Sequence, residues 1–259
     1  MMKRKAMKTA IEDVVTTGSP SDSASEKVAS TSTVSVIIPT LNEAGNIPYV
    51  LNSIPSWVQE VVIVDGRSSD DTERIARLLH PGVKVIHELT PGKGAALKAG
   101  LYAATSDYLI IMDADGSMDG MRLEAFRDVM DKGAQFVKGT RFALGGGSAD
   151  ITRVRALGDA GIRLLLRLFF GARYSDATYG YFAVRADCRD HLNIDTNGFE
   201  SEILIVIRAY RSGLRIAEVP CFEANRIHGE SNLSALKDGI RIAQVIVREK
   251  VRGHHAATV

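Results

Sequence analysis

The feature that most constrains the fold is an alternation of short apolar segments with amphipathic ones through the first half of the chain. Five strand-like segments recur at a spacing of roughly 25–30 residues, and they are 34–39, 60–65, 83–87, 108–112 and 135–139. Helices are expected between them at 46–54, 70–79, 93–104 and 121–132. This order predicts an α/β fold with a mostly parallel, Rossmann-like central sheet and helices on both faces.

The second half is less regular. Residues 144–148 (LGGGS) predict a flexible loop, and the later elements are expected to be helices at 153–170, 199–210 and 233–251 and strands at 178–184 and 214–219. The stretch before the first strand is rich in Ser, Thr and Ala and lacks apolar periodicity. We therefore expect a disordered tail at 1–33, one domain at 34–252 and a second disordered tail at 253–259.

Composition limits the class of protein. The chain has 259 residues, of which 45% are hydrophobic and 24% charged, as in ordinary soluble domains. A net charge of +1, without Lys and Arg runs interleaved with aromatics, argues against a nucleic-acid partner. Cys188 and Cys221 cannot build a disulfide framework and have no zinc-ligand spacing. Because no apolar run reaches ~18 residues and no secretory h-region is found, we expect a cytoplasmic protein.

Two aspartates stand where the fourth strand is expected to end. Asp113 and Asp115 flank Ala114 directly after the apolar segment 108–112. In extended chain, residues two apart point to the same side, so both carboxylates can converge. Oxygen ligands of this kind suit Mg²⁺ or Mn²⁺, and such an ion suits a diphosphate. The alternative is a polar turn, since Asp and Gly are common at strand ends.

Polar residues also follow other predicted strands. Asn42 and Glu43 follow the first strand, Asp65 ends the second, and Thr140 and Arg141 follow the fifth. In parallel sheets, ligands bind beyond the carboxyl ends of the strands. The repetition of polar clusters at these ends predicts one binding site along that edge.

The motifs together resemble the family 2 glycosyltransferases of the GT-A fold, most of all the dolichyl- or polyprenyl-phosphate mannose synthases. The matching segments run from about 34 to 248 and are SVIIPTLNEAGNI, VVIVDGRSSDDT, GKGAAL, IIMDADGS, VKGTR, DATYGYFAV, GFESEI and RIHGESNLSALKDGIRI. The resemblance implies a nucleotide-sugar-binding half at 34–142 and an acceptor-binding half at 143–252.

The resemblance also implies roles for individual residues of the donor site. The base and ribose pocket would be lined by Pro39, Thr40, Asn42, Glu43 and Asp65. The divalent cation and the diphosphate would be held by Asp113, Ala114, Asp115, Lys93, Arg226 and Ser231. Two alternatives stay open. Glu43 also suits a helix N-terminus, and Lys93 also suits a solvated turn.

Departures from the family pattern matter. Ser117 stands where the synthases often carry Gln as a further metal contact. The Gln-x-x-Arg-Trp segment of processive synthases is absent, so a single transfer is expected, and the C-terminal transmembrane region of many prokaryotic relatives is absent too. The segments 162–170 and 236–252 are amphipathic enough for peripheral membrane contact. A core-facing role is the preferred interpretation of both.

For the chemistry, we expect inverting transfer of mannose from GDP-mannose to a polyprenyl or dolichyl phosphate. Such an acceptor is already anionic, and by resemblance it would be positioned by Arg141, Arg153, Arg155 and Arg226. Arg153 and Arg155 also suit a solvated basic helix face. The alternative is UDP-glucose or another donor with a hydroxyl acceptor, which needs a base. Glu200 is then preferred over Glu202.

Other classes of protein fit the sequence less well. A protein that binds nucleotide sugars without turnover is disfavoured by the intact aspartate pair. A Rossmann oxidoreductase is disfavoured because no Gly-x-Gly-x-x-Gly follows the first strand. A sugar nucleotidyltransferase should carry a Gly-rich, Arg-containing loop where this chain reads PTLNEAG.

Overall fold

The computed structural model describes residues 32–230 and 235–255. Its main sheet has seven strands in the order β3-β2-β1-β4-β7-β5-β8. Their bounds are β1 Val34–Thr40, β2 Glu60–Asp65, β3 Lys84–His87, β4 Tyr108–Ile111, β5 Phe136–Thr140, β7 Phe182–Arg185 and β8 Ile216–Pro220. All neighbouring pairs are parallel except the two made by β7, which runs antiparallel between β4 and β5. The predicted α/β fold with a mostly parallel sheet is confirmed.

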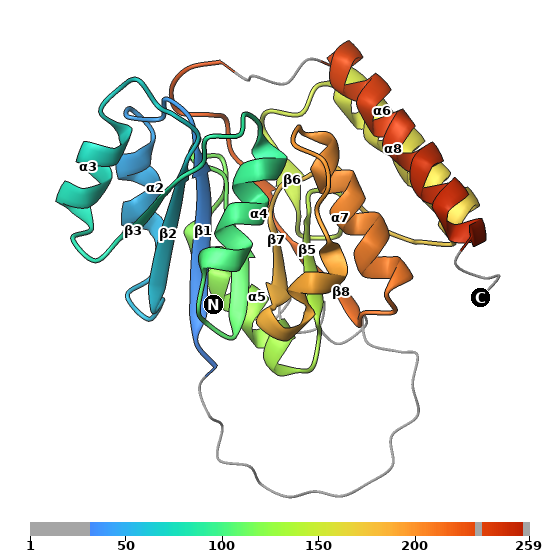
Figure 1. Cartoon of the computed structure of the whole chain (residues 1–259), viewed down its shortest axis with the longest axis horizontal. Helices are drawn as coiled ribbons and strands as arrows, with labels where there is room; N and C mark the ends of the chain where they lie inside the picture. The colour runs from blue at the N-terminus through green and yellow to red at the C-terminus, as the bar shows by residue number, and fades with distance from the viewer. Residues whose placement is uncertain (1–31, 231–234, 256–259) are drawn as a thin grey trace, which may run out of the picture.

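Helices cover both faces of this sheet (Figure 1). They are α2 Ile47–Ser53, α3 Thr72–Leu79, α4 Lys93–Ala103, α5 Leu123–Asp131, α6 Arg153–Phe170, α7 Glu200–Arg211 and α8 Ala235–His255. No helix in the described part of the chain joins enough length to enough apolar character to span a membrane.

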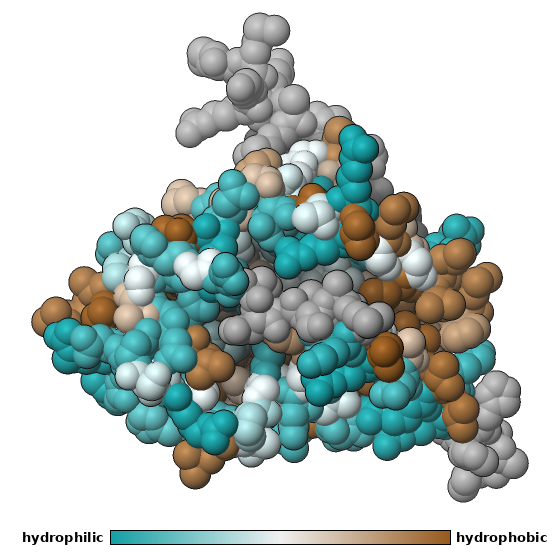
Figure 2. All heavy atoms as spheres, turned by 90° about the horizontal axis from the view of Figure 1, so that it is seen from above, coloured by the Kyte–Doolittle hydropathy of each residue, from teal (hydrophilic) through white to brown (hydrophobic). Residues whose placement is uncertain are grey.

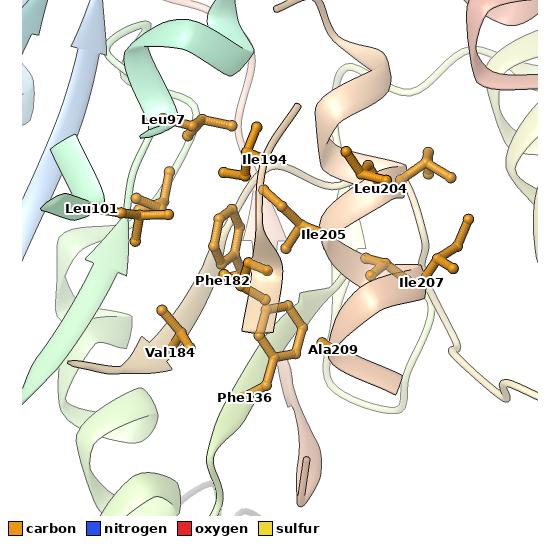
Figure 3. Packing of buried hydrophobic residues seen from close by; sticks show 14 of the residues in the cluster. Leu97, Leu101, Phe136, Phe182, Val184, Ile194, Leu204, Ile205, Ile207 and Ala209 are labelled. Carbon is orange, nitrogen blue, oxygen red and sulfur yellow. The ribbon is translucent and has the colours of Figure 1, made fainter. Parts of the chain in front are cut away.

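The period-2 pattern of the strands divides the core into two layers. In β1, Ile37 belongs to one hydrophobic cluster, while Val36 and Ile38 belong to the other. The first cluster packs under α4, α6, α7 and α8, and the second under α2, α3 and α5. Figure 3 shows the first layer, where Leu97 of α4 and Ile205 of α7 meet around Phe182 of β7. Strands buried on both faces explain the continuous apolar runs in the sequence.

One predicted strand is shorter than expected. The segment 178–184 was expected to be extended throughout, but β7 begins only at Phe182. The Asp176 carboxylate accepts hydrogen bonds from the backbone N–H of Thr178 and Tyr179, each at 3.2 Å. This local pairing holds the chain in a turn, because an Asp side chain competes with the sheet for backbone donors.

Small elements appear where none was expected. Gly147–Ser148 of the predicted loop forms β6, which pairs with β9, Phe222–Glu223. A 3₁₀ helix spans Ala186–Leu192. Helix α8 ends at His255, past the expected domain limit at 252. The predicted tail at 1–33 lies almost wholly outside the described residues, so the domain limits stay a prediction.

An ion cluster ties α7 to α8. Asp195, in the loop before α7, pairs with Arg208 of α7 at 3.1 Å and with Arg248 and Arg252 of α8 at 2.7 and 2.8 Å. Burial alone would raise the pKa of Asp195, but the hydrogen bonds from Arg252 and Arg208 and the charge of Arg248 outweigh it. They hold the pKa at about 2, below the usual 3.8.

We expect Asp195→Asn to destabilise the protein in a pH-dependent way. Since the folded pKa lies below the unfolded one, the contribution of Asp195 is present above pH 3.8 and is lost as the pH falls through 2. The side chain is 34% exposed, so solvent screening limits the effect to about 1 kcal/mol at pH 6. Denaturant titrations of the variant and the wild type should converge near pH 2. Asp187→Asn, at an exposed pair with Arg185, is the control with no measurable effect.

Candidate active site

Asp113 and Asp115 lie just beyond the carboxyl end of β4, as the sequence predicts. Asp115 Oδ1 accepts hydrogen bonds from the backbone N–H of Ser117 at 3.0 Å and from its hydroxyl at 2.7 Å. Its Oδ2 lies 3.5 Å from Nη2 of Arg226. Ser117, which departs from the family pattern, therefore orients Asp115 through two hydrogen bonds.

Asp113 belongs to a charged triad with Lys93 and Glu202. Nζ of Lys93, the first residue of α4, lies 2.7 Å from Asp113 Oδ1 and 2.6 Å from Glu202 Oε1 in the first turn of α7. Gly180 completes the packing, because a Cβ there would lie 2.9–3.1 Å from charged atoms of all three side chains. The predicted role of Lys93 near Asp113 fits this placement, and a freely solvated Lys93 does not.

The triad has strongly altered electrostatics. Burial raises the pKa of Asp113 to about 6, and Glu202 and Asp115 add to the rise while Lys93 opposes it. Burial would lower the pKa of Lys93, but the Asp113 and Glu202 carboxylates outweigh it and raise that pKa well above its usual range. The carboxylates of Asp113, Asp115 and Glu202 are thus balanced by the Lys93 ammonium group and by the guanidinium of Arg226, which lies 3.5 Å from Asp115.

This donor set fits a hard divalent cation. Mg²⁺ and Mn²⁺ are commonly held by one or two carboxylates together with substrate phosphates. Within the described residues, no three His, Cys, Asp or Glu side chains are grouped as a metal site by themselves. Asp113 and Asp115 would hold the ion, with the remaining ligands coming from a diphosphate or from water.

Asp65 supplies an orphan acceptor at the end of β2. Its Oδ2 accepts from the backbone N–H of Arg67 at 3.1 Å and of Ser68 at 3.0 Å. Its Oδ1 is buried and has no hydrogen-bond partner in the described part of the chain. The strand register places Asp65 beside Thr40, the last residue of β1. A buried acceptor of this kind suits a ribose hydroxyl or a base N–H.

The turn after β1 is held by the turn after β2. Asn42 has a φ of 56°, in the left-handed region that Asn tolerates, and its Oδ1 accepts from the backbone N–H of Ser69 at 2.8 Å. The backbone N–H of Glu43 donates to the Thr72 hydroxyl at 2.9 Å. Pro39 is partly buried within β1. The predicted pocket residues therefore lie on two interlocked turns.

A segment from the C-terminal half crosses these turns. Arg226 Nη1 lies 3.0 Å from Glu43 Oε1, and Arg226 thereby joins Glu43 to Asp115. The backbone N–H of Ile227 donates to the Asp115 carbonyl at 3.2 Å. Arg226 thus lies at the predicted donor site, and the Glu43 carboxylate is ion-paired. Ser231 lies outside the described residues.

Arg141 is engaged by acidic and hydroxyl side chains of the protein. Its guanidinium donates to both carboxylate oxygens of Asp176 at 2.7 and 3.0 Å, to Thr178 at 3.0 Å and to Glu223 at 3.2 Å. Its side chain is 8% exposed. Arg141 thus joins the end of β5 to β9, and its contact with a phosphate stays a prediction.

The other predicted acceptor cations lie at the start of α6. Arg153 is exposed there, and Arg155 pairs with Asp150 at 2.8 Å. This arrangement matches the alternative of a solvated basic helix face. Their contact with an acceptor phosphate stays a prediction.

Glu200 and Glu202 lie on different sides of α7. Glu200 Oε1 accepts from the backbone N–H of Gly198 at 3.1 Å, and its side chain lines a cavity of about 250 Å³ next to Arg241 and Arg248 of α8. Glu202 reaches Lys93 and Asp113 instead. Glu202 is therefore the carboxylate of the two that reaches the Asp113 edge, and the role of Glu200 as a base stays a prediction.

We expect Glu202→Gln to lower the rate of sugar transfer about 10–100-fold, because the neutral side chain no longer holds Lys93 and Asp113 in place. Glu200→Gln, two residues away on another face of the helix, should stay within about twofold of wild type. Initial rates at saturating substrate measure both. Equal losses in the two variants would contradict this assignment.

The sequence of the chain matches the family model described as "Glycosyl transferase family 2" over residues 35–188. The chain belongs to glycosyl transferase family 2. The fold and the Asp113–Asp115 edge agree with this membership, and the protein is a glycosyltransferase of the GT-A fold.

Two relatives of this glycosyltransferase carry informative names. It is 33% identical to the undecaprenyl-phosphate mannosyltransferase of Micrococcus luteus over 215 residues, 78% of this chain and 87% of the relative. It is 31% identical to the polyprenol monophosphomannose synthase of Mycolicibacterium smegmatis, covering 83% and 85% of the two chains.

A solved structure is similar across most of the fold. The glucosyl-3-phosphoglycerate synthase of Mycobacterium tuberculosis, in complex with Mn²⁺, uridine diphosphate and phosphoglyceric acid, has a TM-score of 0.66 and 25% identity. The match covers 85% of this glycosyltransferase and 78% of that chain.

Proposed function

We propose that this glycosyltransferase moves one mannose from GDP-mannose to a polyprenyl phosphate, with inversion at the anomeric carbon. The observation that carries the proposal is the shared edge of β1, β2 and β4. There the orphan oxygen of Asp65 suits the nucleoside, and Asp113 and Asp115 suit a cation on the diphosphate. Relatives named for undecaprenyl-phosphate and polyprenol-phosphate mannose transfer support the choice of sugar and acceptor.

In the proposed reaction, an acceptor phosphate oxygen forms the new bond to the anomeric carbon as the bond to the nucleoside diphosphate breaks. The leaving group takes the bonding electron pair. A bound divalent cation would supply charge neutralisation on that leaving group. We expect Arg226, which lies beside Asp115, to bind phosphate oxygens in a planar fork when the donor is present.

The carboxylates of the site favour an acceptor that is already ionised. Glu202 is ion-paired to Lys93 at 2.6 Å, and Glu200 lies against Gly198 and α8. Glu202 is therefore not a free base, which a hydroxyl acceptor would need, and Glu200, whose Oε2 has no hydrogen-bond partner in the described part of the chain, lines the pocket beside α8 instead. A phosphate monoester is anionic near neutral pH and needs no base.

A second candidate is transfer from UDP-glucose to a hydroxyl acceptor. The favouring observation is the similarity to a glucosyl-3-phosphoglycerate synthase that was solved with Mn²⁺ and UDP-glucose. In that case the Lys93–Glu202 pair would have to open so that Glu202 could accept the proton.

A donor comparison tests the proposal. The purified protein is incubated with labelled GDP-mannose or UDP-glucose, Mg²⁺ or Mn²⁺, and a short polyprenyl phosphate in detergent. We expect label from GDP-mannose in the organic phase, and none when EDTA is added. Labelling from UDP-glucose alone would overturn the proposed donor.

A further inference from the structure

Helices α6 and α8 form a paired ridge along one side of the molecule (Figure 1). Nζ of Lys250 near the end of α8 donates to the carbonyl of Phe169 at the end of α6, at 2.8 Å. Their inner faces are anchored in the core by Leu166, Val245 and Ile246. The predicted core-facing role therefore accounts for only some of the apolar residues of α6 and α8.

The outer faces of the same two helices are apolar. On α6 the four large side chains that are 56–73% exposed are Val154, Leu157, Leu164 and Leu168. On α8 the three that are 54–55% exposed are Ile240, Val247 and Val251. Figure 2 shows hydrophobic side chains gathered on the side where Figure 1 places this ridge. Contiguous exposed apolar side chains of this kind mark an interaction surface.

The exposed charged residues that α6 and the described part of α8 themselves carry are all positive. The acidic residues of α6 and of the described part of α8 are Asp159, Asp238 and Glu249, and all are buried at 5% exposure or less. The exposed charged residues of the two helices are Arg153, Arg167, Lys237, Arg241 and Arg252. An apolar stripe on two helices whose own exposed charges are all cationic is complementary to an anionic lipid surface.

We propose that the outer face of α6 and α8 docks on an anionic lipid bilayer. A second copy of the chain is the less favourable occupant, because a two-fold contact would place this cationic surface against itself. Docking would also serve transfer to a lipid phosphate. β6, just before α6, pairs with β9, and β9 leads to Arg226 at the donor site. That advantage rests on the proposed function, whereas the docking itself does not.

Vesicle sedimentation tests the docking. Vesicles of phosphatidylglycerol and phosphatidylcholine are compared with phosphatidylcholine alone, without polyprenyl phosphate or nucleotide sugar. A failure to dock is therefore distinguishable from a failure to transfer sugar. We expect wild type to sediment with the anionic vesicles and added salt to weaken this. The double variant Leu157→Glu/Leu164→Glu should reduce the partition at least about tenfold.

The matched control is Leu78→Glu on α3, where the leucine is 72% exposed but far from this ridge in the fold. It should sediment like wild type. If wild type stays in the supernatant, or if the double variant sediments like wild type, the proposal is overturned. Light scattering completes the test, since a dimer that the double variant dissociates, without vesicle binding, would make a second copy the occupant and also overturn it.

Discussion

Asp115→Asn should abolish metal-dependent sugar transfer while the protein stays folded. The amide keeps the size of the carboxylate and can still accept hydrogen bonds from Ser117, so the turn after β4 is preserved. It removes the negative charge that a divalent cation on the donor diphosphate needs. Lewis-acid stabilisation contributes several kcal/mol, so we expect a loss of about 10³-fold or more in the initial rate.

The control for this variant is Asp128→Asn, on the exposed side of α5. It should keep the wild-type rate, and both variants should melt within about 2 °C of wild type, because neither change alters the core. Turnover by Asp115→Asn at the wild-type rate, with EDTA present, would remove the metal assignment.

Arg141→Met should cause the largest loss of stability among single substitutions in the site. Asp176 has a fully buried side chain, and Glu223 is 13% exposed, so both carboxylates depend on the Arg141 guanidinium for charge and hydrogen bonds. Burial would lower the pKa of Arg141, but these two partners raise it above its usual range. Removing one partner of a buried ion pair costs about 3–5 kcal/mol. We expect the free energy of unfolding in urea to fall by about this amount.

The matched control is Arg155→Met, whose pair with Asp150 leaves the two side chains 35% and 43% exposed. Exposed pairs contribute little, so we expect a change below about 1 kcal/mol. The result that would restore the original interpretation is a stable Arg141→Met protein that has lost affinity for a phosphate ligand. A folded Arg141→Met protein with reduced activity but normal affinity for the ligand would show instead that the lost activity does not come from lost phosphate binding.

The sequence was enough to predict the sheet and its binding edge. The strands that end at Thr40, at Asp65 and just before Asp113 are mostly apolar, and in a parallel sheet their carboxyl ends must share one edge. The antiparallel direction of β7 was not predictable in the same way. Its apolar residues suit either direction, and the turn before it is held by Asp176, which accepts hydrogen bonds from Thr178 nearby and from Arg141, 35 residues away in the sequence.

The surroundings of Arg141, Glu200 and Glu202 were not predictable from the sequence, for related reasons. Arg141 has a cationic side chain at a strand end, which suits a phosphate, but Asp176 and Glu223 reach it from 35 and 82 residues away. Which of Glu200 and Glu202 reaches Lys93 and Asp113 depends on how α7 is rotated about its own axis. Residues 203–207 of that helix are all buried, so no polar face fixes the rotation in the sequence. Gly180, within the segment TYGYF, leaves room for the side chains of Lys93, Asp113 and Glu202. This glycine is the feature of the sequence that could have indicated the cluster.

The most direct test of the central claim compares two acceptors that differ only in the phosphate, a short polyprenyl phosphate and the corresponding free polyprenol. Each is incubated with labelled GDP-mannose, Mn²⁺ and the wild-type protein, and label is counted in the organic phase. The proposed function predicts labelling of the polyprenyl phosphate alone, since Glu202, the carboxylate beside Asp113, is ion-paired to Lys93 and is not free to act as a base for a hydroxyl. Labelling of the polyprenol, or of neither lipid, would contradict it.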